Sequence, residues 1–321
     1  MAYRIDPTRS AAVEVRRILG EQLDGAADEL RRPDGPDAAA IHQARKHIKK
    51  ARSLLRLARP GLGPQLVRHI QAELRQVAGD LAGARDADSL VEAADGLSGA
   101  TVDQDEQAAV ASLRSVLAHR ADAARGAFTG DRSTVSAATL TLRRTAGWLR
   151  RVPPRVDGWE AIGDGLRRQY EQGCGALAAL GEQPDMDELH DWRKRVKDLW
   201  YHERLLAQLW PEVVRPMASG AEDLAGALGT DHDLGLLRGL LGGDVDLDLD
   251  GGDDARRLAL AVIDRERSRL QAEARRLGRR LYADTPQAWA RRHRAWWEAT
   301  IEQAAADQAG VEDPAEAGGT A

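Results

Sequence analysis

The 321-residue sequence predicts an all-α protein made of two similar halves. Ala, Leu, Arg and Glu, which favour helices, dominate it, and runs of β-branched or aromatic residues typical of strands are missing. Apolar residues recur at intervals of three and four, as on helices with one buried face. A motif near residue 41 returns near residue 189. We expect two similar helical bundles related by a pseudo-two-fold axis.

Helix boundaries follow from capping residues and prolines. Asp37, Ser133 and Asp185 precede periodic segments and are suitable N-caps. Pro153 and Pro154 interrupt helical hydrogen bonding between the two halves. The expected helices span residues 9–32, 37–59, 63–82, 86–97, 103–129, 133–151, 158–180, 186–209, 212–228, 231–241, 253–282 and 285–305.

The second half of the sequence resembles the first. IHQARKHIKKARSLLRL at 41–57 aligns with LHDWRKRVKDLWYHERL at 189–205, an offset of 148 residues. LAGARDADSL at 81–90 aligns with LGTDHDLGLL at 228–237, an offset of 147. Two matches at nearly one offset indicate a duplicated helical unit. We expect an N-terminal tail over 1–8, a first bundle over 9–154, a second over 155–305 and a disordered acidic tail over 306–321.

Composition restricts the class of protein. Cys174 is the only cysteine, so a disulfide framework and a cysteine-based zinc site are excluded. No apolar run reaches the ~18–20 residues that span a bilayer. The N-terminal MAYRIDPTRS lacks the apolar region of a signal peptide. We expect a cytoplasmic protein without a cofactor and without contact with a membrane.

The first copy of the repeated motif carries a basic stripe beside its apolar one. Between Ala38 and Ala72 the chain has eight Lys or Arg and no acidic residue. Like charges stacked along one helix face destabilise the helix, so water, a partner segment or an anionic ligand has to compensate them. The stripe consists of His42, Arg45, Lys49, Arg52 and Arg56, widened by Lys46 and Lys50.

The second copy repeats the stripe with acidic residues interleaved. Asp191, Asp198 and Glu203 lie among its basic residues. All five lysines of the chain belong to the two copies of the motif, whereas every Lys or Arg position outside them is an arginine. Lysine is a compact point charge that can follow a row of phosphate oxygens, whereas arginine forms fixed bidentate contacts. The basic residues of this copy are His190, Arg193, Lys197 and Arg204, flanked by Lys194 and Arg195.

These motifs resemble the CHAD family, the conserved histidine α-helical domain, over about residues 9–300. The residues that carry the resemblance are His42-x-x-Arg45, Lys49-Lys50-x-Arg52, Leu54-Leu55-Arg56-Leu57, His190-x-x-Arg193 followed by Lys197, Arg85-Asp86-Ala87-Asp88 and His232-Asp233-Leu234.

The resemblance implies two four-helix bundles whose basic helices line a central channel. It also implies binding of inorganic polyphosphate without catalysis, often at polyphosphate granules. Many relatives carry a CYTH triphosphate-hydrolase domain, but no ExExK motif occurs here, so we expect a stand-alone member. Trp200 and Asp198 depart from the basic pattern of the family. The expected polyphosphate-binding residues are His42, Arg45, Lys46, Lys49, Lys50, Arg52, Arg56, His190, Arg193, Lys194, Lys197 and Arg204.

Two other functions remain open. Nucleic acid would also suit basic helices, but the stripes offer few side chains for base edges and no aromatic row for stacking. A metal-dependent hydrolase of polyphosphate or phosphate esters could use nearby histidines and aspartates, although neither motif histidine has a second ligand at i+4. The residues considered as ligands are His42, His190, His232, Asp231 and Asp233.

Two acidic segments mask the charge of the helical body. Residues 243–254 and 295–321 each contain six acidic residues and no Lys or Arg. Without them, 46 basic face 39 acidic side chains, so the net charge of −5 hides a positive body. Asp246–Gly251 begins like a calcium loop, but Arg257 stands at the twelfth position, where a glutamate is required. The acidic loop can also be interpreted as a solvated linker. A third interpretation is that the loop and the acidic tail fold over the basic groove and imitate its anionic ligand.

Overall fold

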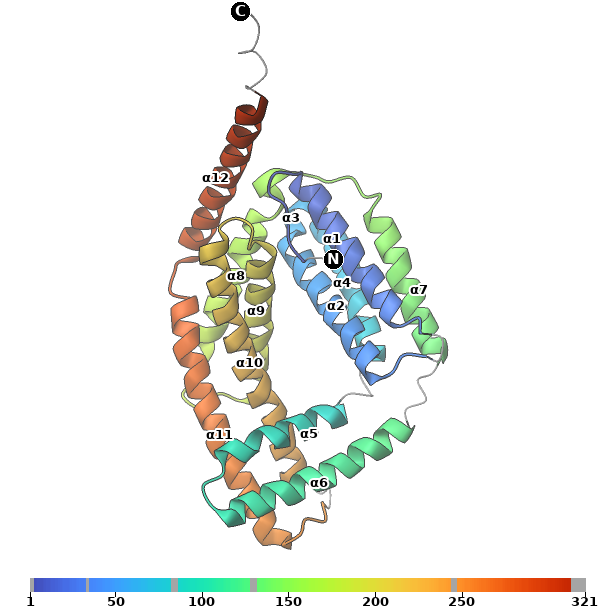
Figure 1. The fold of residues 1–321 in the computed structure, drawn as a ribbon, viewed down its shortest axis with the longest axis vertical. Coiled ribbons are helices and arrows are strands. Elements are labelled where there is room, and N and C mark those ends of the chain that lie inside the picture. Colours follow the sequence, from blue (N-terminus) through green and yellow to red (C-terminus); the bar gives the residue numbers. More distant parts are fainter. Residues whose placement is uncertain (1–2, 33–34, 82–85, 128–131, 244–246, 313–321) are drawn as a thin grey trace, which may run out of the picture.

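The computed structural model describes residues 3–32, 35–81, 86–127, 132–243 and 247–312. Its regular structure there consists of α-helices and two short 3-10 helices, η1 and η2, which confirms the all-α prediction (Figure 1). None of the described helices is long and apolar enough to cross a bilayer. The elements are α1 Ala11–Glu29, α2 Ala38–Leu57, α3 Arg59–Leu62, α4 Pro64–Asp80, α5 Asp86–Gly96, η1 Leu97–Ala100, α6 Gln104–Ala127, α7 Arg132–Leu149, η2 Gly158–Ala161, α8 Gly163–Ala179, α9 Met186–Leu205, α10 Pro211–Gly242, α11 Gly252–Leu281 and α12 Pro286–Glu312.

Two of the three predicted N-caps are confirmed. The Asp37 carboxylate accepts the backbone N–H of Ala40 at 2.7 Å, at the start of α2. Asp185 forms a capping box with Glu188 at the start of α9. The prediction for Ser133 is wrong, because α7 begins at Arg132 and places this serine inside the first turn.

Two predicted boundaries differ from the structure. The expected helices 212–228 and 231–241 form one continuous helix, α10. No proline interrupts this segment at Gly229, whose missing side chain leaves room for the Arg193 guanidinium. At the other end of the chain, α12 continues to Glu312, beyond residue 305. Residues 313–321 of the expected acidic tail lie outside the described residues.

The first bundle consists of α1, α2, α4 and α7. Each helix contributes one apolar face at intervals of three and four, and residues such as Ile18, Ile48, Ile70 and Leu142 are fully buried between them. Helices α8, α9, α10 and α11 form the second group, with α12 packed on α8. One continuous apolar core joins both groups.

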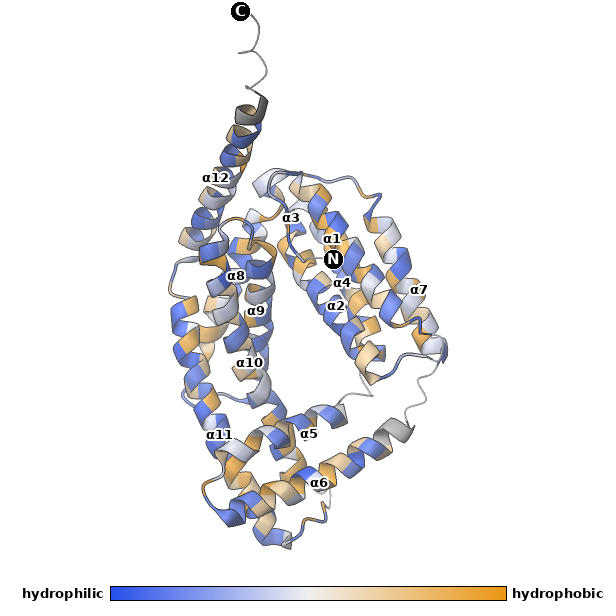
Figure 2. Ribbon diagram, viewed as in Figure 1, coloured by the Kyte–Doolittle hydropathy of each residue, from blue (hydrophilic) through white to orange (hydrophobic). Residues whose placement is uncertain are grey.

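The expected first bundle, residues 9–154, includes α5 and α6. In the structure these two helices do not pack in that bundle. They pack on α10 and α11 and form a second apolar core there (Figures 1 and 2). The reason is length: α10 and α11 have 32 and 30 residues, against 17 to 20 in the first bundle. The distal apolar residues of α10 and α11, such as Leu237 and Ile263, are buried in one core with Leu97 and Leu113.

Helix positions agree with the predicted duplication. Adding the offset of 148 to the bounds of α2, residues 38 and 57, gives 186 and 205, the bounds of α9. The same offset converts the first residue of α6, 104, into that of α11, 252. The duplication and its pseudo-two-fold axis stay predictions, which these equal spacings support.

The described part of the acidic loop packs away from the basic helices. Leu247 and Leu249 are buried in the second core, and the backbone N–H of Asp250 donates to the Ser112 hydroxyl at 2.8 Å. Arg257 lies within α11 and pairs with Asp254 at 2.7 Å. Residues 247–254 therefore do not cover the groove, and the beginning of the supposed calcium loop lies partly outside the described residues.

Gly165 allows α8 to approach α2 closely, and we expect Gly165→Ala to destabilise the protein. A Cβ at this position would overlap the Leu57 carbonyl at the end of α2, so the helices would have to separate. The expected loss is about 2–3 kcal/mol in the free energy of unfolding, measured by chemical denaturation. Gly175→Ala on the same helix is the control, because nothing lies within 4 Å of a Cβ there. Equal effects of the two substitutions would contradict this interpretation.

Candidate anion-binding site

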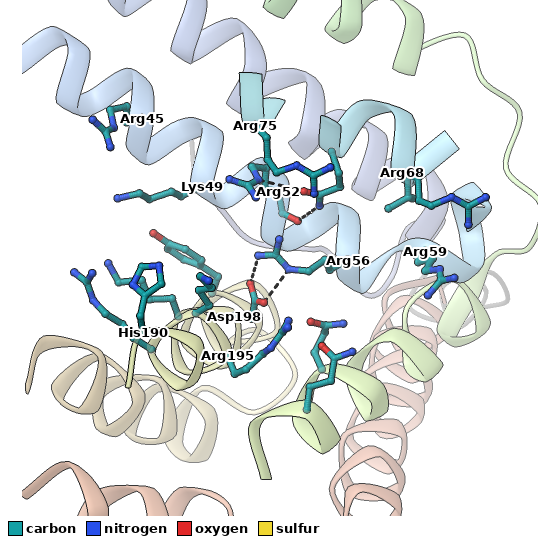
Figure 3. Close-up of a pocket in the computed structure, with 18 of the residues that line it drawn as sticks. Arg45, Lys49, Arg52, Arg56, Arg59, Arg68, Arg75, His190, Arg195 and Asp198 are labelled. Carbon is teal, nitrogen blue, oxygen red and sulfur yellow. Dashed lines mark hydrogen bonds and ion pairs between the residues drawn. The ribbon is translucent and has the colours of Figure 1, made fainter. Parts of the chain in front are cut away.

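A cavity of about 990 Å³ lies between the two halves, bordered by α2 and α4 on one side and α8, α9 and α10 on the other (Figure 3). We call it the basic cavity. Among the described residues that line it, Asp198 is the only carboxylate. Its eleven Lys or Arg side chains are Arg45, Lys49, Arg52, Arg56, Arg59, Arg68, Arg75, Arg193, Lys194, Arg195 and Lys197.

The spacing of residues on α2 explains one wall. Arg45, Lys49, Arg52 and Arg56 are separated by four, three and four residues, so they lie along one helix face. The apolar stripe on the neighbouring face, which includes Ile48, is buried in the core and holds the helix in place. Figure 3 shows these four side chains along the α2 side of the cavity, with Arg56 reaching Asp198 of α9.

The structure brings together eight of the twelve predicted binding residues in this cavity. They are Arg45, Lys49, Arg52, Arg56, His190, Arg193, Lys194 and Lys197. The other four do not line it: His42 and Lys46 lie elsewhere on α2, whereas Lys50 and Arg204 border a second cavity. The described cavities therefore do not gather all twelve residues in one groove, and the binding role of each residue stays a prediction.

Several residues of the cavity were not predicted. Arg68 and Arg75 come from α4 and lie seven residues apart, which places them on one face two turns apart. Arg68 belongs to the stretch from 38 to 72 that has no acidic residue, so this property of the sequence could have identified it as a binding residue. The remaining additions are Arg59, Val67, Gln71, Gln169, Gln172, Arg195, Asp198, Tyr201 and His232.

An ion pair joins the two walls. Arg56 donates from Nε to Oδ2 of Asp198 at 2.8 Å and from Nη2 to Oδ1, a bidentate contact (Figure 3). The Asp198 side chain is 2% exposed and that of Arg56 is 28% exposed. Burial alone would raise the pKa of Asp198, but the Arg56 charge and hydrogen bond outweigh it and lower the pKa. Asp198 thus links α9 to α2 across the cavity.

Arg52 is also held in place. Its Nε donates to Oε1 of Gln71 at 3.2 Å, and Nε2 of Gln71 donates back to the Arg52 carbonyl at 2.6 Å. Burial lowers the pKa of Arg52, and the nearby charges of Arg56 and Arg75 lower it further. The guanidinium groups therefore repel one another in a partly desolvated space, which favours an anion that would neutralise them.

Two histidines meet at the α9–α10 side of the cavity. The rings of His190 and His232 lie 5.2 Å apart, and Nδ1 of His232 is 3.0 Å from the Asp233 carboxylate. Asp231 faces α11 instead, where it accepts from Arg267 at 3.1 Å and Gln271 at 2.9 Å. Within the described ranges, no three His, Cys, Asp or Glu side chains gather as metal ligands would.

The fold and this site define an all-helical protein with a cationic cavity between two groups of helices. The chain belongs to the CHAD domain family, whose model matches residues 17–242.

Two solved structures share the fold. PptA from Streptomyces chartreusis is 16% identical, with a TM-score of 0.55 over 84% of this chain and 99% of that one. The CHAD domain from the plant Ricinus communis is 18% identical, with a TM-score of 0.58 over 88% of this chain and 95% of that one. No curated protein sequence matches this chain.

Proposed function

We propose that this protein binds inorganic polyphosphate in the basic cavity and does not hydrolyse it. The observation that carries the proposal is the ratio of eleven Lys or Arg side chains to one carboxylate around the cavity. Membership of the CHAD family supports it. The proposed place of action is the cytoplasm, at polyphosphate granules.

The geometry suits a linear polyanion. Basic side chains from α2, α4 and α9 surround the cavity, so successive phosphates can meet cations on both walls (Figure 3). Arg52 is held by Gln71, so it loses little side-chain freedom on binding. Released counterions make such binding strongly dependent on salt.

Nucleic acid is the weaker candidate. Tyr201 is the only Phe, Tyr or Trp among the described residues that line the cavity, so bases find no aromatic row to stack on. Isothermal titration calorimetry at two salt concentrations tests the main proposal. Undetectable polyphosphate binding at low salt, or easy displacement of polyphosphate by DNA or RNA, would overturn it. Phosphate release that a chelator abolishes would instead indicate a metal-dependent hydrolase.

Polyphosphate binding is expected to strengthen as the pH falls from about 7.5 to 5.5. Burial lowers the pKa of His190, and Lys194, His232 and Arg193 lower it further, whereas Asp191 raises it. His190 is therefore neutral in the free protein at pH 7, and bound phosphate favours its charged form.

Binding then takes up a proton, so the affinity should rise by up to about tenfold as the pH falls over this range. Calorimetry over this pH range measures the effect. His190→Gln should flatten the profile, whereas His119→Gln, on the exposed surface of α6, should not. A profile unchanged by His190→Gln contradicts the assignment.

A further inference from the structure

A second cavity, of about 510 Å³, lies where α2 and α9 meet the N-terminal segment and the start of α10. We call it the Lys50 cavity. None of the described residues lines both cavities. On α2, His47 and Lys50 lie on a different face from Lys49, because successive residues are about 100° apart. The Lys50 cavity is therefore a separate space rather than an extension of the basic cavity.

Cations dominate this cavity as well. Lys50 and Arg204 are half-buried in it, and Arg4 and Arg215 lie at its exposed edge. Glu222 is the one carboxylate among the described residues that line it. In the part of the chain that the structure describes, no ion pair joins Lys50 or Arg204 to a carboxylate within 4.0 Å. Burial lowers the pKa of Lys50, and the charges of Arg204 and Lys46 lower it further.

The repeat explains why these charges are unbalanced. With the offset of 148, Arg56 corresponds to Arg204, and Lys50 corresponds to Asp198. In the basic cavity, Arg56 meets the Asp198 carboxylate, whereas the equivalent pair in the second cavity is Arg204 with Lys50. A lysine thus stands where the other copy supplies an anion. The missing negative charge has to come from solvent ions or from a ligand.

The side chains around the Lys50 cavity favour a compact ligand. The Trp200 ring is already in contact with the Arg204 guanidinium at 5.2 Å and stacks on Tyr201 at 4.9 Å, so it offers no platform for a nucleobase. His47 is held by Gln22 at 3.0 Å and fits against Gly25, which has no side chain to displace it. Its ring adds a further polar group beside the cations.

The contact between α2 and α9 separates the two cavities. Ser53 and His202 meet there, with Oγ and Nε2 3.2 Å apart, and the two residues are 0% and 1% exposed. Asp198, 1% exposed, closes the same contact beside them. A polyphosphate chain in the basic cavity therefore does not pass through this contact to reach Lys50.

We propose that the Lys50 cavity is a second anion site, which takes a small inorganic phosphate anion such as pyrophosphate independently of the chain in the basic cavity. The site goes beyond polyphosphate binding and does not depend on it. Lys50 and Arg204 provide its charge, and the oxyanion replaces the carboxylate that the other copy has at this position.

Calorimetric titration of the full chain with pyrophosphate at low salt tests the proposal. Lys50→Gln with Arg204→Gln is expected to remove one binding event or weaken it at least about tenfold. Lys49→Ala with Lys197→Ala, in the basic cavity, should leave that event in place. Circular dichroism and an unchanged affinity for long-chain polyphosphate establish that the Lys50→Gln, Arg204→Gln variant is folded.

Two results would overturn the second site. One is a pyrophosphate titration that is the same for wild type and for the Lys50→Gln, Arg204→Gln variant. The other is loss of the Lys50-dependent event when long-chain polyphosphate is already bound. If polyphosphate binding in the basic cavity is wrong, the result is different. Wild type then binds no long-chain polyphosphate, but the pyrophosphate binding that depends on Lys50 remains.

Discussion

Replacing Lys49 and Lys197 with alanine is expected to weaken polyphosphate binding about 10- to 100-fold at ~0.1 M salt. The two lysines come from α2 and α9 and line the basic cavity. Each phosphate contact that is lost reduces the slope of log K against log salt by roughly 0.7–0.9, so the double variant should reduce it by about 1.5. Calorimetry at several salt concentrations gives both quantities from one series.

The matched control is Arg276→Ala with Arg280→Ala. Both arginines are exposed on α11, and neither lines a described cavity. The pair removes the same net charge, so it measures how much long-range attraction contributes to affinity. If the control weakens binding as much as the Lys49→Ala, Lys197→Ala variant, the cavity is not the binding site.

Asp198→Asn is expected to lower the free energy of unfolding by about 3 kcal/mol and to strengthen polyphosphate binding. The substitution breaks a bidentate pair whose carboxylate is buried, and removal of one partner leaves Arg56 without its counter-charge. Arg56 is then able to pair with phosphate instead. Chemical denaturation and calorimetry measure the two effects, which should have opposite signs.

The destabilisation also depends on pH. The folded-state pKa of Asp198 is lowered, so its stabilising contribution is present above the unfolded value of about 3.9 and is lost as the pH falls through the folded-state value. The difference between wild type and Asp198→Asn should therefore be largest near pH 7 and should narrow below about pH 4.

Asp191→Asn is the control for this effect. Asp191 lies on the same helix and pairs with Lys194 at 2.8 Å, but the side chains are 73% and 52% exposed. An exposed pair of this kind contributes at most about 1 kcal/mol. Similar losses for Asp191→Asn and Asp198→Asn, or unchanged polyphosphate affinity in Asp198→Asn, would show that the Arg56 pair does not join the halves as described.

Local features of the chain were predictable because they depend on neighbours in sequence. The intervals of three and four residues predict helix faces, and the carboxylates of Asp37 and Asp185 satisfy the first N–H groups of the helices that follow them. The same intervals place Arg45 and Lys49 on one stripe. The motifs aligned at an offset of 148 lie on α2 and α9, whose observed bounds differ by the same offset.

Residue spacing does not determine which face of a helix a distant helix covers. Lys50 and Lys49 are adjacent in the chain, yet they border different cavities because α9 packs between their faces. Arg75 joins the site only because α4 packs beside α2, and Asp198 is neutralised only because Arg56 reaches it across the two halves.

The placement of α5 and α6 has the same origin. Their own apolar periodicity predicts helices but not a partner, and any complementary apolar face nearby would satisfy it. The long distal faces of α10 and α11 provide that partner, so residues 86–127 leave the first bundle. Helices and basic stripes thus follow from local sequence, whereas the cavities and their charge balance arise only when helices far apart in the chain bury one another's apolar faces.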